Sequence, residues 1–159
     1  EWIKTGRVDL GFLRLPTVEE FETIFLEEDT LLVVLPENHP MADCNQFPVE
    51  ALSEYPFMLL EKGAKAEISE NFKRNHIMPN VRFTTWDDYA VMSMVEGGLG
   101  IAILPQLILR RIPYKIIAKK LNVPAYRKIG IALRDKRRAP LAVKKFIEYL
   151  DFRNAPSGS

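Results

Sequence analysis

The sequence has few of the residues that form disulfides, metal sites and catalytic centres. Cys44 is the only cysteine among 159 residues, so the chain has no internal disulfide, and we expect a reducing, cytoplasmic setting. One thiol and two separated histidines, His39 and His76, do not form a metal-binding cluster. P-loop, dinucleotide-binding and serine-hydrolase motifs are absent as well. We therefore expect no cofactor, no metal and no enzymatic activity, and we interpret Cys44 as a small loop residue.

Long hydrophobic runs are also missing. No apolar stretch reaches the roughly 18 residues that cross a membrane, so we expect no membrane partner. Residues 1–5 do not resemble a signal peptide, and the chain opens in mid-pattern without Met, which suggests a piece of a longer protein. Residues 154–159 have no periodicity and are predicted to be a disordered tail.

Charge is balanced overall but uneven along the chain. The net charge is +1, yet residues 1–60 hold 3 basic and 12 acidic side chains, whereas residues 61–159 hold 19 basic and 9 acidic. A basic half is compatible with nucleic-acid binding. Here the basic residues stand in short pairs and triplets without aromatic residues between them, so a solvated face is the preferred interpretation. Complementary charge that assists head-to-tail self-association is the alternative.

Hydrophobic patterning predicts an α/β fold. The most informative run is residues 94–106 (MVEGGLGIAILPQ), which is typical of a helix end, a glycine turn and a short buried strand stopped by Pro105. Short apolar or alternating runs predict strands, and stretches with helical spacing follow most of them, which favours a mainly parallel sheet. The expected strands are residues 8–14, 31–35, 57–60, 81–84, 101–104 and 127–133; the expected helices are residues 64–72, a segment after Thr85, 105–112 and a last helix from Pro140.

Two strand-to-helix junctions are the candidate ligand site, because ligands of open α/β sheets bind beyond the carboxyl ends of strands. Free backbone amides there suit a carboxylate, threonine hydroxyls add hydrogen bonds, and Trp86 offers an apolar wall. Alternatives remain open: Trp86 packs between lobes, Thr85 is a helix cap paired with Asp88, and Glu61 favours an amine or a hydroxyl. The candidate ligand-binding residues are Leu60, Glu61, Lys62, Gly63, Thr84, Thr85 and Trp86.

Five segments in order resemble the effector-binding domain of LysR-type transcriptional regulators. Each motif is weak by itself, but the series covers residues 6–150. The segments are residues 6–12 (GRVDLGF), 36–42 (PENHPMA), 51–57 (ALSEYPF), 95–105 (VEGGLGIAILP) and 140–150 (PLAVKKFIEYL).

The resemblance implies two Rossmann-like α/β lobes of the type 2 periplasmic-binding-protein kind, with a small-molecule effector between them. Lobe I would comprise residues 1–28 and 124–153, and lobe II residues 29–123. Arg14, after the first strand, becomes a further ligand-binding candidate. The opening strand and helix of lobe I are missing from this sequence, so we expect weak effector binding or an unpaired sheet edge.

The resemblance also implies partners. The effector, a small molecule such as a carboxylate, would control DNA binding by a helix-turn-helix domain that is absent from this sequence, and the domain would form a homo-oligomer. A solute-binding protein of a transport system is the first alternative, and an enzyme on the same fold is the second.

Overall fold

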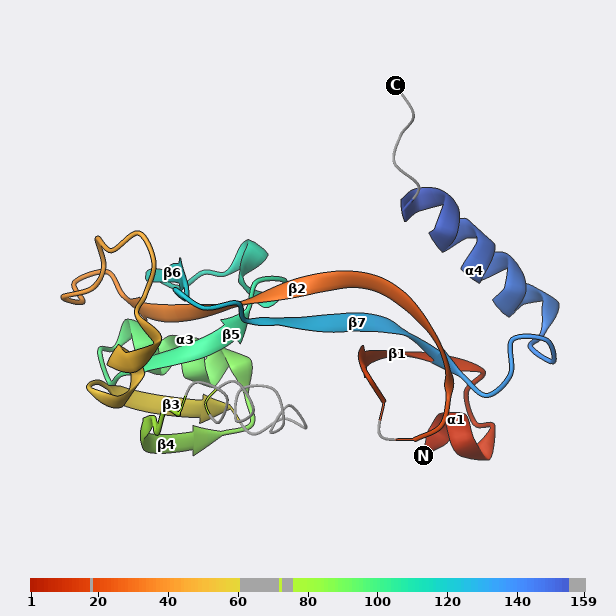
Figure 1. Cartoon of the computed structure of the whole chain (residues 1–159), viewed down its shortest axis with the longest axis horizontal. Helices are drawn as coiled ribbons and strands as arrows, with labels where there is room; N and C mark the ends of the chain where they lie inside the picture. The colour runs from red at the N-terminus through yellow and green to blue at the C-terminus, as the bar shows by residue number, and fades with distance from the viewer. Residues whose placement is uncertain (18, 61–71, 73–75, 155–159) are drawn as a thin grey trace, which may run out of the picture. The chain divides into compact units, whose positions relative to one another are not determined.

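The structure is a computed structural model that describes residues 1–17, 19–60, 72 and 76–154 (Figure 1). The chain divides into two compact units: unit 1 contains Glu1–Glu28 and Lys128–Ser159, and unit 2 contains Asp29–Arg127. Among the described residues, no helix is long and apolar enough to cross a membrane. The expected helix at residues 64–72 lies outside the described residues except for Phe72, and the predicted tail does so except for Asn154.

The core of unit 1 combines an antiparallel strand pair with helix α4. Strand β1 pairs antiparallel with β7, and the buried Ile131 and Leu133 of β7 pack against Ile147 of helix α4. Helix α4 begins directly after Pro140, as the sequence predicts. The bounds in unit 1 are α1 (Trp2–Thr5), β1 (Leu10–Leu15) and α4 (Leu141–Asn154), with parts of β2 (Glu22–Pro36) and β7 (Tyr126–Leu133).

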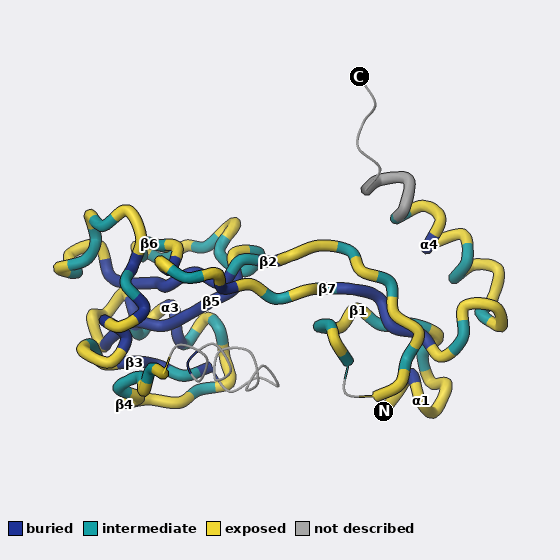
Figure 2. Tube along the Cα trace, in the orientation of Figure 1, coloured by how far each residue is buried: buried dark blue, intermediate teal, exposed yellow. Residues whose placement is uncertain are grey.

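Unit 2 has a sheet with apolar residues on both faces. Strand β3 is parallel to β4 and β5, whereas β2 is antiparallel to β5 and β6. Leu31 and Val33 of β2 belong to one hydrophobic cluster and Val34 to another, which explains the unbroken apolar run. Figure 2 shows this part of β2 as buried. The elements are η1 (Val49–Ser53), β3 (Pro56–Leu60), β4 (Asn80–Thr85), α3 (Asp88–Glu96), β5 (Ile101–Pro105), η2 (Ile108–Arg111) and β6 (Ile116–Lys120).

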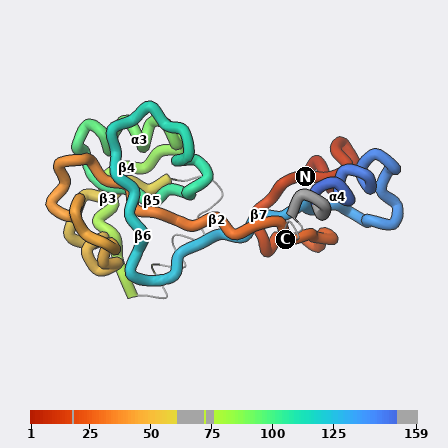
Figure 3. Tube along the Cα trace, turned by 90° about the horizontal axis from the view of Figure 1, so that it is seen from above, coloured from red at the N-terminus to blue at the C-terminus, as the bar shows by residue number. Residues whose placement is uncertain are grey.

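Strands β2 and β7 continue from one unit into the other and lie side by side (Figures 1 and 3). The sequence predicted only the second part of β2. The strand begins at Glu22 because Ile24 and Leu26 pack on the unit 1 core while alternate positions face solvent. Unit 2 extends to Arg127, whereas the resemblance implied a lobe boundary near residue 123. Within unit 2, the Leu31 N–H donates to the Ala125 carbonyl at 2.9 Å.

Two expectations about elements are wrong, and one strand was missed. The sheet is mixed rather than mainly parallel, because β2 returns antiparallel beside β5. Residues 105–112 do not form one helix: Pro105 ends β5 opposite Leu31, where a missing N–H is tolerated, and only η2 follows. Strand β6, which the sequence analysis missed, pairs with β2 at the edge of the sheet.

The glycine turn between α3 and β5 is as predicted. Gly98 has a φ of 76°, in the left-handed region that closes helices. Gly100 has a φ of 155°, and a Cβ built there would collide with the Pro56 carbonyl at the start of β3. The turn thus lets β5 enter the sheet directly beside β3.

Candidate ligand-binding site

The strands that precede the two predicted junctions, β3 and β4, end side by side at one edge of the unit 2 sheet. In the parallel register of β3 and β4, Leu59 lies opposite Thr84 and Leu60 opposite Thr85. Strand β5 is also parallel to β3, so its last residue, Pro105, points to the same side. We call this set of strand ends, Leu60, Thr85 and Pro105, the carboxyl edge. Open α/β sheets bind ligands at such an edge.

Thr85 does not cap helix α3, which corrects one expectation. Asp87 is the N-cap, and its Oδ1 accepts hydrogen bonds from the Tyr89 N–H (2.8 Å) and the Ala90 N–H (2.9 Å). Asp87 is a better N-cap than Thr85 because its carboxylate also interacts favourably with the positive end of the helix dipole. Thr85 instead accepts a longer hydrogen bond from the Asp87 N–H at 3.4 Å.

The cap changes the chemistry of this junction. Free backbone amides were expected to bind a ligand carboxylate here. Two amides of this junction, those of Tyr89 and Ala90, already donate to Asp87, and the Asp87 carboxylate adds a negative charge. What remains near α3 are the hydroxyls of Thr84 and Thr85 and the indole of Trp86, which is 71 % exposed within its unit. Hydroxyls, a carboxylate and an aromatic face suit a polar ligand with hydrogen-bond donors.

The end of β5 is held by a residue that sequence reasoning missed. Asp29 is only 2 % exposed, and its Oδ1 accepts a hydrogen bond from the Leu107 N–H at 3.0 Å. Its Oδ2 accepts from Arg127 Nε at 2.9 Å and pairs with Nη2 at 2.7 Å. The one signal in the sequence was an acidic residue two positions before the continuous apolar run 31–35, where burial of a charge requires a partner.

Four further residues were candidates from the sequence: Glu61, Lys62, Gly63 and Arg14. Glu61, Lys62 and Gly63 lie outside the described residues. Arg14 lies in β1 of unit 1, opposite Ile129.

His39 and Cys44 make structural contacts in unit 2. His39 Nδ1 accepts from the Met41 N–H at 3.1 Å, and its ring packs edge-on against Tyr55 with centroids 4.4 Å apart. Burial lowers the pKa of His39. Cys44 packs against the larger hydrophobic cluster of unit 2. Among the described residues, no group of three potential ligands could hold a metal ion.

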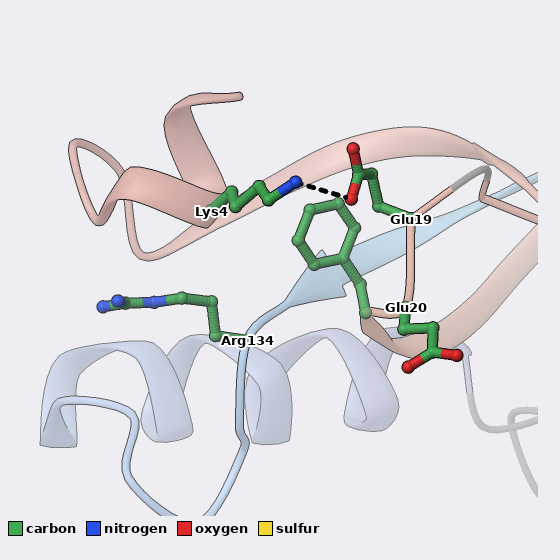
Figure 4. A pocket seen from close by; sticks show the side chains of 5 residues that line it. Lys4, Glu19, Glu20 and Arg134 are labelled. Atoms are coloured by element: carbon green, nitrogen blue, oxygen red, sulfur yellow. Dashed lines mark hydrogen bonds and ion pairs between the residues drawn. The ribbon is translucent and has the colours of Figure 1, made fainter.

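Each unit has a hollow lined by described residues. The larger, about 400 Å³, is in unit 1 and has a charged rim: Lys4 pairs with Glu19 at 3.1 Å, while the Glu20 carboxylate and the Arg134 guanidinium point in opposite directions (Figure 4). The smaller, about 260 Å³, is in unit 2. Its lining is entirely apolar: Leu59, Phe72, Ile77, Met78, Pro79 and Val81.

Comparison with known proteins identifies one family. The profile described as LysR substrate binding domain matches residues 1–153. The HTH-type transcriptional regulator YvbU of Bacillus subtilis is 31 % identical over 150 residues, which cover 93 % of this chain and 51 % of that protein. The probable HTH-type transcriptional regulator LrrA of Synechococcus elongatus is 33 % identical over 133 residues, which cover 82 % and 45 %. The chain spans about half the length of these relatives.

Solved structures share the fold. The regulatory domain of CcmR from Synechocystis, in complex with 2-PG, aligns with a TM-score of 0.85 and 21 % identity over 99 % of this chain and 79 % of that one. The effector-binding domain of QuiR, in complex with shikimate, aligns with a TM-score of 0.82 and 23 % identity over 96 % and 75 %. The two-lobed α/β fold predicted from the sequence is confirmed by these neighbours.

Proposed function

The chain belongs to the family of LysR substrate-binding domains, and on that premise we propose that it is the effector-sensing domain of a bacterial transcription regulator. The observation that supports this most is the register of β3 and β4, which brings Leu60, Thr84 and Thr85 to one edge of the sheet. Relatives named as regulators over nearly the whole chain support the same assignment.

We propose that the effector is a small polar molecule with hydroxyl groups. Thr84 and Thr85 offer donors and acceptors, Asp87 accepts, and Trp86 covers an apolar face. One neighbour of the same fold, the effector-binding domain of QuiR, was solved with shikimate, a small molecule that carries hydroxyl groups. A carboxylate, the class first predicted, needs donors other than the amides of Tyr89 and Ala90, because Asp87 occupies them.

In this proposal the effector shifts a conformational equilibrium and is not consumed. The proposal includes DNA binding by a helix-turn-helix domain elsewhere in the full-length regulator, a cytoplasmic location, and a homo-oligomer as the assembly that the family resemblance implies. Family membership favours a regulator over a solute-binding protein for transport. An enzyme is disfavoured because the relatives are named as transcription regulators.

A thermal-shift screen of small hydroxy acids, with ligand recovery by mass spectrometry, tests this function. The screen uses the full-length regulator that contains this chain, together with its Thr85→Val and Trp86→Ala variants. Thr23→Val, at an exposed position of β2, is the matched control. We expect a stabilising ligand whose effect both carboxyl-edge variants reduce and the control retains, with the ligand recovered unchanged. A ligand that is converted during the assay would refute sensing in favour of catalysis.

A further inference from the structure

Asp29 is the only buried charged or polar residue among the described residues, and it joins three segments of the chain. It lies in β2, its carboxylate pairs with Arg127 in β7 at 2.7 Å, and it accepts the Leu107 N–H at 3.0 Å. A buried carboxylate is expensive to desolvate, and two apolar side chains of similar volume commonly stabilise a fold as well. The arrangement therefore calls for an explanation beyond stability.

The position of this pair within the fold supplies that explanation. Asp29 and Arg127 are the first and last residues of unit 2, so the pair joins the two points where β2 and β7 leave the unit. One residue further along both strands, Glu28 and Lys128 form a second ion pair at 4.0 Å, but each side chain is 50 % exposed. Exposed pairs contribute little to structure, whereas a buried pair with a forked donor fixes geometry.

The Asp29 carboxylate also fixes the chain that follows β5 at the carboxyl edge. Leu107 and Gln106 follow β5 directly, and the Gln106 N–H donates to the Thr30 carbonyl at 2.8 Å beside the Leu107–Asp29 bond. One residue after Thr30, the Leu31 N–H donates to the Ala125 carbonyl at 2.9 Å. This hydrogen bond connects β2 to the residue directly before β7. Movement of the loop after β5 is therefore connected through Asp29 to both strands.

We propose that Asp29 and Arg127 form a clasp that couples the carboxyl edge to β2 and β7, the two strands that connect the units. In this proposal Asp29 and Arg127 are positioning residues that do not contact the effector. They determine whether a displacement of the carboxyl edge also displaces β2 and β7. The coupling is a property of the chain by itself; its use in signalling rests on the proposed function.

Native-state hydrogen exchange measures this coupling without any ligand. A negative result would therefore refute the coupling and leave the proposed effector-sensing function untested by this experiment. Amides that open together share one opening free energy and one dependence on denaturant. In the wild-type protein we expect Gln106, Leu107 and Leu31 to exchange as one group. In the double variant Asp29→Asn/Arg127→Met, which removes both charges and keeps an acceptor for Leu107, we expect the rates of the edge amides and of Leu31 to separate at least tenfold.

The matched control is Glu28→Gln/Lys128→Met, one residue away on the same two strands, which should leave the three amides exchanging together. If the first double variant does not fold, Arg127→Lys replaces it, because lysine keeps the charge and loses the fork; a smaller separation is then expected. The clasp is refuted if the three amides already exchange independently in the wild type. It is equally refuted if they stay together in the folded clasp variant, or if all unit 2 amides accelerate alike.

Discussion

Asp87 is a single residue on which the start of helix α3 depends. Its carboxylate is the acceptor for two N–H groups that otherwise have no partner in the helix. We expect Asp87→Ala to lower the free energy of unfolding by about 1 kcal/mol. Asp87→Asn, which keeps the acceptor, should stay close to the wild type. Urea unfolding followed by circular dichroism measures both, and equal losses in the two variants would show that the cap is not the cause.

From the lowered pKa of His39 we expect the free energy of unfolding to depend on pH. Because burial lowers the pKa of His39 from its usual 6.5, the unfolded chain binds a proton at a higher pH than the folded chain. Its contribution to stability is complete above about pH 6.5 and is lost as the pH falls from there to the lower folded pKa. Urea midpoints between pH 5 and 8 should show this loss. His39→Gln should remove it, whereas His76→Gln, at an exposed position, should not; the reverse result would contradict the assignment.

At the scale of elements, the glycine turn determines how β5 enters the sheet. Gly100 faces the Pro56 carbonyl too closely for any Cβ, whereas the space around Gly98 is open and its left-handed φ is one that asparagine tolerates. We expect Gly100→Ala to destabilise the protein by more than about 1 kcal/mol. Gly98→Asn should cost clearly less. Thermal unfolding of the two variants compares them, and similar losses would mean that contact with Pro56 is not limiting.

The sequence predicted those elements whose pattern is local. The run at 101–104 and the glycines before it determine β5 and its turn without reference to distant residues. The first part of β2 was missed because a strand that connects two units is half exposed, and its acidic residues hide the alternation of Ile24 and Leu26. Asp29 was missed because its partner, Arg127, is 98 residues away in the sequence. Such a partner is defined only by the folded topology.

For the whole molecule, β1 is one of the edge strands of the described sheet, and β4 ends the sheet on the other side. Unpaired edges with apolar side chains promote association, and lysine on an edge suppresses it. Leu13 of β1 is 37 % exposed. We expect Leu13→Lys to lower the concentration-dependent association of this chain in analytical ultracentrifugation. Leu141→Lys, on the exposed start of α4, should leave it unchanged. Equal effects would assign the association to general hydrophobicity rather than to the edge.

The indole of Trp86 is a direct probe of effector binding at the carboxyl edge of unit 2, the site that we propose. The chain has two tryptophans, Trp2 in unit 1 and Trp86 at the edge, so Trp2→Phe leaves Trp86 as the only indole. A fluorescence titration of this variant with a hydroxy acid found by the thermal-shift screen tests the claim. We predict a saturable change in Trp86 emission whose midpoint matches the concentration that stabilises the protein. A ligand that stabilises the protein and leaves Trp86 emission unchanged would contradict the account.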